Sequence, residues 1–97
     1  MTSKVIIPYG ESYEWAVPVR SASGEVMDLT GASHWAVVEQ LNVAPGSYAS
    51  ATTSLAEGGV WGDLEEEACG PGVWRVETWL RFEGMTRRID AFELTVT

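Results

Sequence analysis

The residues that could do chemistry in this chain are few and mostly lie far apart in the sequence. Glu65, Glu66 and Glu67 are adjacent carboxylates, and a hydrolase would need one of them held neutral in an apolar pocket beside an ionised partner. Adjacent glutamates in a turn point in different directions, so we expect a solvated surface. Calcium could use these glutamates with Asp28 and Asp63, because hard cations take oxygen ligands, but no EF-hand-like spacing supports this.

The chain has one histidine, His34, and one cysteine, Cys69. A zinc site would have to combine these two with carboxylates, a thiol nucleophile would need an activating base, and a lone cysteine excludes an intrachain disulfide. We expect His34 to be a partly buried strand residue and Cys69 to fill a small apolar space. The glycines between residues 58 and 72 lack the following helix and the neighbouring Lys or Arg that a phosphate site needs. The sequence therefore predicts no catalytic residue, no metal ligand and no cofactor.

Size and charge limit the partners that the protein can have. The 97 residues predict a single domain spanning 1–97, and the net charge of -8 argues against a nucleic-acid partner. Residues 1–67 hold ten acids and two bases, so this part is expected to face water or a basic partner. The apolar stretch after Lys4 is shorter than a signal-peptide core, and no segment reaches the roughly 20 apolar residues that span a bilayer. We expect no membrane partner and synthesis in the cytoplasm.

Alternation of apolar and polar residues predicts that the elements are strands. In Val73 to Phe82 one set of alternate residues is apolar except for Thr78, and the other includes Arg75, Trp79 and Arg81. An outward-facing Trp79 is a candidate interface anchor or sugar platform. The alternative, in which Trp79 lies under the 42–59 loop or against an arginine, stays open.

Three other segments are predicted strands with special positions. Tyr13 to Val19 alternates but contains Pro18, which cannot donate to a ladder and so predicts an edge strand or a bulge. Ser33 to Leu41 is apolar on both faces, so its register is ambiguous and it is either central or covered by another chain. Val5 to Ile7 is also apolar on both faces, so the N-terminal strand is expected to pack at the sandwich edge or to exchange with a neighbour.

Turn residues predict how these strands connect. Glu83 and Gly84 fit a two-residue hairpin loop, and a β-bulge near Asp90 and Ala91 is needed to turn Phe92 and the apolar residues after it towards the core. A weak strand is predicted around Tyr48 to Leu55, then a short strand ending near Trp61. Residues 63–69 are predicted to form one short helical turn, capped by Asp63 with Glu66 three residues later. The result is an all-β sandwich of about 6–8 strands.

The order of these segments resembles a known family. An apolar strand leads through a Gly24-Glu25 turn to Asp28-Leu29-Thr30-Gly31, then to the strand from Ser33, the Gly84 hairpin and a last strand. This pattern resembles the immunoglobulin-like N-terminal domain of phage upper baseplate proteins and similar small proteins of phage tails and baseplates. The resemblance implies an immunoglobulin-like antiparallel β-sandwich and a non-enzymatic structural component of a virion, in its tail or baseplate or as an adaptor or decoration protein. Those baseplate proteins usually continue into a receptor-binding or fibre-bearing region, whereas this sequence stops at Thr97, so we do not expect receptor binding here.

The resemblance also implies how the protein acts. Its partners would be other virion proteins and copies of itself in a symmetric assembly, joined through an open edge strand and aromatic anchors. The candidate interface residues are Val5, Ile6, Ile7, Trp61, Arg75, Trp79 and Arg81. The alternative is a carbohydrate-binding module in which Trp61 and Trp79 together stack on sugar rings.

Overall fold

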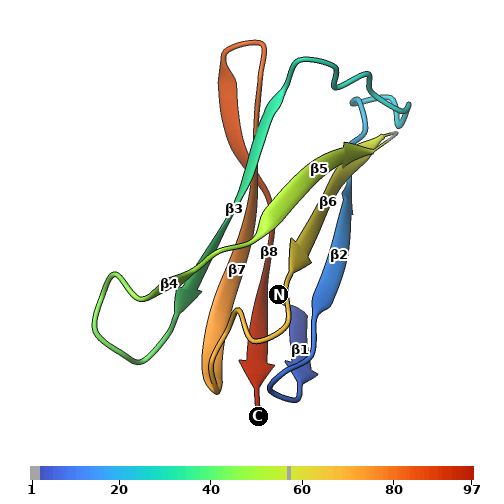
Figure 1. Ribbon diagram of the computed structural model, residues 1–97. Helices are drawn as coiled ribbons and strands as arrows, with labels where there is room; N and C mark the ends of the chain where they lie inside the picture. The colour runs from blue at the N-terminus through green and yellow to red at the C-terminus, as the bar shows by residue number, and fades with distance from the viewer. Residues whose placement is uncertain (1–2, 57) are drawn as a thin grey trace.

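The computed structural model describes residues 3–56 and 58–97, which form two β-sheets packed face to face (Figure 1). The strands are β1 (Ser3–Ile7), β2 (Tyr13–Pro18), β3 (Ser33–Gln40), β4 (Tyr48–Ala49), β5 (Thr52–Ala56), β6 (Gly59–Leu64), β7 (Gly72–Phe82) and β8 (Met85–Val96). One sheet has five strands in the order β1-β8-β7-β3-β4, and the other has three in the order β2-β6-β5. The predicted all-β sandwich is therefore confirmed.

The hairpin of β7 and β8 is the longest pairing in the fold. Glu83 and Gly84 have positive φ angles of 52° and 78°, as expected for a two-residue primed turn, which confirms the predicted loop. The pairing shifts register between Thr78 and Trp79, so that Thr78 lies opposite Asp90 and Ile89 is the extra residue. The predicted bulge thus exists, slightly earlier than expected, and it turns Phe92 and every second residue after it into the core.

The N-terminal strand packs at the edge of its own chain's sheet. β1 runs parallel to β8, with Val5 opposite Leu94, so that Val5 and Ile7 pack against the core while Ile6 points away and is 71% exposed. β2 is an edge strand of the smaller sheet, as Pro18 predicted. Both strands leave one side without a described neighbour.

The region from 48 to 69 differs from the sequence prediction. The single weak strand is interrupted after Ala49, because the chain crosses there from β4 in one sheet to β5 in the other. The predicted helical turn at 63–69 is wrong, because Asp63 pairs with residues of β2 and β5 and Leu64 is buried at the end of β6. A tight turn follows, in which the Ala68 N–H donates to the Glu65 carbonyl at 3.1 Å and Glu67 has φ 62°, which is not helical.

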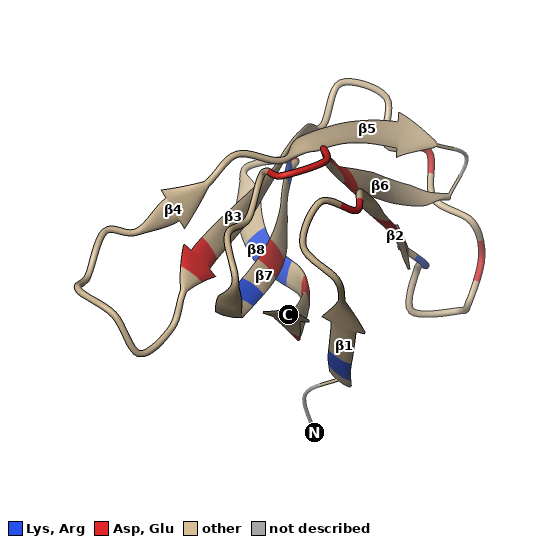
Figure 2. Ribbon diagram, turned by 60° about the horizontal axis from the view of Figure 1, so that its bottom comes forward, with Lys and Arg blue, Asp and Glu red and all other residues tan. Residues whose placement is uncertain are grey.

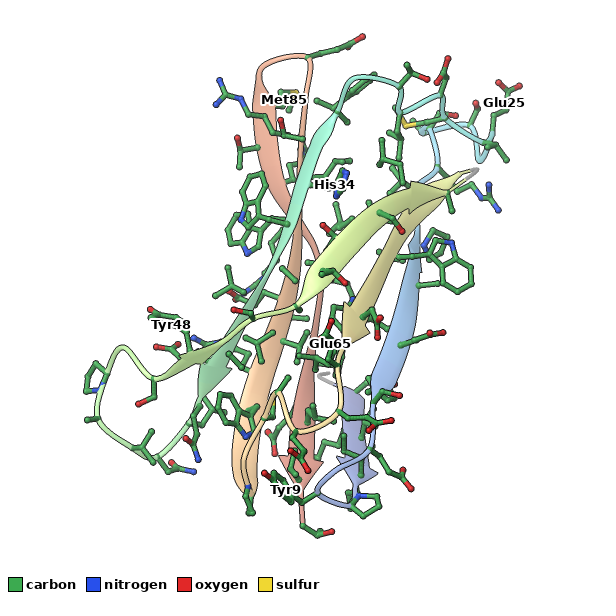
Figure 3. All side chains as sticks on the ribbon, in the orientation of Figure 1. Tyr9, Glu25, His34, Tyr48, Glu65 and Met85 are labelled. Carbon is green, nitrogen blue, oxygen red and sulfur yellow. The ribbon has the colours of Figure 1, made fainter. Side chains whose placement is uncertain are left out.

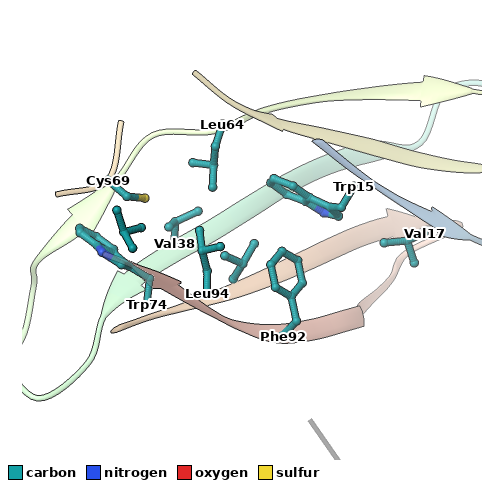
Figure 4. Close-up of a cluster of buried hydrophobic side chains, with 10 residues drawn as sticks. Trp15, Val17, Val38, Leu64, Cys69, Trp74, Phe92 and Leu94 are labelled. Carbon is teal, nitrogen blue, oxygen red and sulfur yellow. The ribbon is translucent and has the colours of Figure 1, made fainter. Parts of the chain in front are cut away.

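The core is filled by aromatic and branched side chains from both sheets (Figure 4). Trp15 of β2 packs edge-on against Phe92 of β8, with ring centroids 5.6 Å apart. The Trp15 indole N–H donates to the Thr78 hydroxyl at 2.8 Å, and this bond joins the two sheets in the core, where Thr78 has no exposed surface. A second cluster of Leu29, Val60 and Leu80 continues the core.

Asp28-Leu29-Thr30-Gly31 forms the turn that positions Leu29 in this second cluster. The Asp28 carboxylate accepts bonds from the Thr30 hydroxyl at 2.6 Å and from the Thr30 N–H at 3.0 Å. These two bonds lower the pKa of Asp28, and the bond from the Thr30 hydroxyl has the larger effect. Gly31 has φ 84° and the Ala32 N–H donates back to the Leu29 carbonyl, which completes the turn before β3. The motif is a structural element.

Candidate protein interface

The residues that could do chemistry do not form a site. Glu65, Glu66 and Glu67 are exposed in the turn after β6, and among the described residues no group of three His, Cys, Asp or Glu side chains is arranged to hold a metal ion. His34 is partly buried, with its Nδ1 2.7 Å from the Thr53 hydroxyl. The part of the chain that the structure describes contains no helix long and apolar enough to cross a membrane.

Cys69 is a core residue whose thiol stays protonated. Burial raises its pKa to about 11, from the ordinary value of 9.0. A thiol protonated at neutral pH is a weak nucleophile, because the thiolate is the reactive form. The structure thus agrees with the small apolar filler that the sequence predicts.

The raised pKa of Cys69 gives a pH-dependent stability. Between pH 9 and about 11 the unfolded chain releases this proton while the folded chain keeps it, so stability falls as pH rises through that range and is unaffected below it. The measurement is the free energy of unfolding against pH for the wild type and for Cys69→Ala. We expect the difference between the two curves to be constant up to about pH 9 and to move in favour of Cys69→Ala above it. Parallel curves throughout would contradict the assignment.

The outer face of the five-stranded sheet carries a pair of stacked tryptophans. Trp35 of β3 lies directly opposite Trp79 of β7, and their rings are nearly parallel, at 3°, with centroids 6.3 Å apart. Trp35 is 37% exposed, while Trp79 is partly covered. This pair settles the open position of Trp79, which faces outward and packs against another tryptophan. We call this surface the outer face. It consists of the two tryptophans and the charged side chains on the same side of the sheet, which are Glu39, Arg75, Glu77, Arg81 and Arg88.

Charged residues form a chain of ion pairs next to the tryptophans. Arg75 contacts Glu39 at 2.8 Å and Glu77 at 3.7 Å, and Glu77 also contacts Arg88 at 2.8 Å. The arginines lie on β7 and β8 in the middle of the sheet (Figure 2). The arginines are about half exposed while the glutamates are largely covered, and pairs that remain open to solvent add little stability, typically up to about 1 kcal/mol each.

The indole N–H of Trp79 has no hydrogen-bond partner among the described residues. Its nitrogen, Nε1, is shielded from solvent. An unpaired buried donor typically costs about 1–3 kcal/mol, and native proteins rarely keep one without a reason. An acceptor on a contacting molecule would satisfy this N–H.

The candidate interface residues divide between several surfaces. Trp79, Arg75 and Arg81 share the outer face, and Ile6 lies exposed on the edge strand of the same sheet, whereas Val5 and Ile7 point to the core. Trp61 is 48% exposed but belongs to β6, so its side chain projects from the other sheet.

The predicted sugar platform made of Trp61 and Trp79 is therefore wrong. The two side chains project from opposite faces of the sandwich, because each lies on the outward side of its own sheet. The tryptophan that does accompany Trp79 is Trp35. Sequence reasoning missed it as an interface residue, because β3 is apolar on both faces and only its pairing with β7 decides which side faces outward.

Comparison with known proteins supports the architecture. No protein-family model matches the chain, and no curated protein matches it in sequence. Among solved structures the chain is similar to titin domain M7, with a TM-score of 0.59 and 9% sequence identity, over 98% of this chain and 86% of that chain. A likeness at this identity shows the fold alone, and the fold is immunoglobulin-like, as the resemblance to phage proteins implied. Antibody domains join their sheets with a disulfide, whereas the Trp15–Thr78 hydrogen bond makes an inter-sheet link here.

Proposed function

We propose that this protein is a non-enzymatic structural component of a phage virion, located in the tail or baseplate or bound as an adaptor or decoration protein. It acts through protein contacts in a symmetric assembly, with other virion proteins and copies of itself as partners. The virion setting is supported by the resemblance of the segment order around Asp28-Leu29-Thr30-Gly31 to small phage tail and baseplate proteins. The immunoglobulin-like fold is compatible with this role but is shared by proteins of many functions.

The observation that carries the proposed mode of action is the Trp35–Trp79 pair. Aromatic residues and arginines are the side chains most enriched at the energetic centres of protein interfaces. On the outer face two stacked indoles share the surface with Arg75 and Arg88, which form ion pairs with Glu39 and Glu77, and Arg88 lies opposite Trp79 in the β7–β8 pairing. A partner that covers these rings would remove apolar surface from water and could bring an acceptor to the unpaired indole N–H of Trp79.

The experiment is the incorporation of variants into phage particles purified from a host that produces this chain. We expect the wild-type chain to be present in the particles by mass spectrometry. Trp35→Thr and Trp79→Thr should each lower its occupancy at least tenfold, because threonine preserves the strand but removes the anchor. Near-UV circular dichroism of each purified variant checks that the fold is kept.

Trp61→Thr is the matched control, since it removes an exposed tryptophan from the opposite sheet. Its occupancy should stay near that of the wild type. Absence of the wild-type chain from the particles would contradict the virion role. Equal losses for Trp61→Thr and the two outer-face variants would contradict the assignment of the interface to Trp35 and Trp79.

A further inference from the structure

A cleft at the hairpin end of the sandwich opens beside the second core cluster, and side chains of that cluster form much of its lining. It lies between the chain from 19 to 27 and the β7–β8 hairpin, and its volume is about 430 Å³. Its apolar walls include Val19, Met27, Leu80, Phe82, Met85 and Ile89. Met85 is 54% exposed, so the cleft presents a thioether at its open side. Thioethers make favourable contacts with aromatic rings, so an aromatic side chain fits this lining.

Two bases and one acid lie at the rim of this cleft. Arg87 of β8, Arg20 and Glu83 all line it, so the rim has an excess of positive charge in a chain whose net charge is -8. Arg87 is exposed and makes no ion pair with any residue in 3–56 or 58–97. The cleft thus fits an aromatic group that carries a negatively charged neighbour.

The opposite end of the same molecule carries such a group. Tyr9, in the loop between β1 and β2, is 49% exposed and lies at the far end of the sandwich from Met85 (Figure 3). The loop is held in place, because the Tyr9 N–H donates to the Thr97 carbonyl at 3.0 Å and the Glu11 N–H donates to the Pro8 carbonyl at 3.3 Å. A loop whose backbone is already ordered loses little conformational freedom on binding.

Acidic residues lie on the chain segments that follow Tyr9. Glu11 follows Tyr9 by two residues, and a hollow beside the start of β2 is lined by Glu14, Asp63 and Glu65. None of these carboxylates makes an ion pair with another described residue. The Tyr9 end is therefore complementary in charge to the rim at Arg87.

We propose that Tyr9 of one copy of this chain inserts into the apolar cleft of a second copy, with the acidic residues beside it facing Arg87. The two surfaces lie at opposite ends of a molecule whose longest dimension is 39 Å, so the contact is head-to-tail. Head-to-tail contacts repeat into a closed ring or an open filament. This inference rests on the proposed function only in taking assembly as the role of the protein, and it uses a surface separate from the outer face.

The test is analytical ultracentrifugation of two variants, alone and mixed. Tyr9→Ser removes the inserted side chain and leaves the cleft intact, whereas Arg87→Glu disables the cleft and leaves Tyr9 intact. We expect the wild-type mass to increase with concentration and each variant alone to associate at least tenfold more weakly. An equimolar mixture should form a one-to-one complex and nothing larger, because one working surface remains on each partner. Matched controls are Tyr48→Ser, at an exposed tyrosine on β4, and Lys4→Glu, at an exposed base of β1 that does not line the cleft.

Three outcomes would overturn the head-to-tail contact. They are a wild-type protein that stays monomeric up to millimolar concentration, variants that associate as strongly as the wild type and the controls, and a mixture that forms no one-to-one complex. If one of these is found while Trp35→Thr still lowers occupancy in particles, the proposed function stands and only this contact fails. If the contact is found while the chain is absent from particles, the proposed function fails and the contact stands.

Discussion

Replacing Gly62 with alanine is expected to destabilise the protein by about 1–3 kcal/mol or more, a large share of the total stability of a domain of this size. Gly62 of β6 lies directly opposite Trp15 of β2, and the indole lies against the glycine backbone. A Cβ at position 62 would overlap the six-membered ring of Trp15. The indole would have to move, and its movement would disturb both its packing against Phe92 and its bond to Thr78.

Chemical denaturation measures this cost, and the chain offers a matched control. Gly70 has open space where a Cβ would be added, and its φ lies outside the left-handed region. Gly70→Ala should therefore leave the free energy of unfolding unchanged or raise it by up to about 1 kcal/mol, since a compatible Gly→Ala change typically stabilises by about 0.4–1 kcal/mol. A Gly62→Ala protein as stable as Gly70→Ala would show that the indole of Trp15 does not lie against β6.

Thr78→Val is expected to cost about 1–3 kcal/mol, although valine has nearly the same shape as threonine. The Thr78 hydroxyl is the acceptor for the Trp15 indole N–H at 2.8 Å, and Thr78 is completely buried. Valine would leave that donor unpaired in the core, where water cannot replace the bond. Thr78→Ser keeps the hydroxyl and should lose less than Thr78→Val.

A double-mutant cycle separates this hydrogen bond from the packing around it. In a Trp15→Phe background no donor is present, so Thr78→Val should then be nearly neutral in the free energy of unfolding. The coupling between the two positions should thus account for most of the cost of Thr78→Val. An equal cost of Thr78→Val in both backgrounds would assign the effect to packing alone.

The features that the sequence predicted correctly are the ones decided by neighbouring residues. Glu83 and Gly84 favour the backbone conformation of the turn that they form. After Ile89 the apolar residues of the last strand change from one face to the other, and only a bulge can bring them back to the core side. Pro18 removes a donor from its own strand and so predicts an edge.

The features that the sequence missed depend on residues far apart in the chain. Asp63 and Glu66 have the spacing of a capped helical turn, but pairing of β6 with β2 and β5 takes Asp63 into a strand. The sequence of β3 does not decide which face of the sheet Trp35 occupies, because only the register of β3 against β7 sets it. The cleft near Arg87 is formed by segments more than fifty residues apart, and no local pattern indicates it.

The central claim, that the outer face around Trp35 and Trp79 is buried in the assembled particle, is tested most directly by hydroxyl-radical footprinting. In the free protein Trp35 and Trp61 are both exposed, at 37% and 48%, and both should be oxidised. In particles we expect oxidation of Trp35 to fall at least tenfold while Trp61, on the opposite sheet, stays reactive. Trp35 oxidised in particles at the rate found in the free protein would contradict the claim.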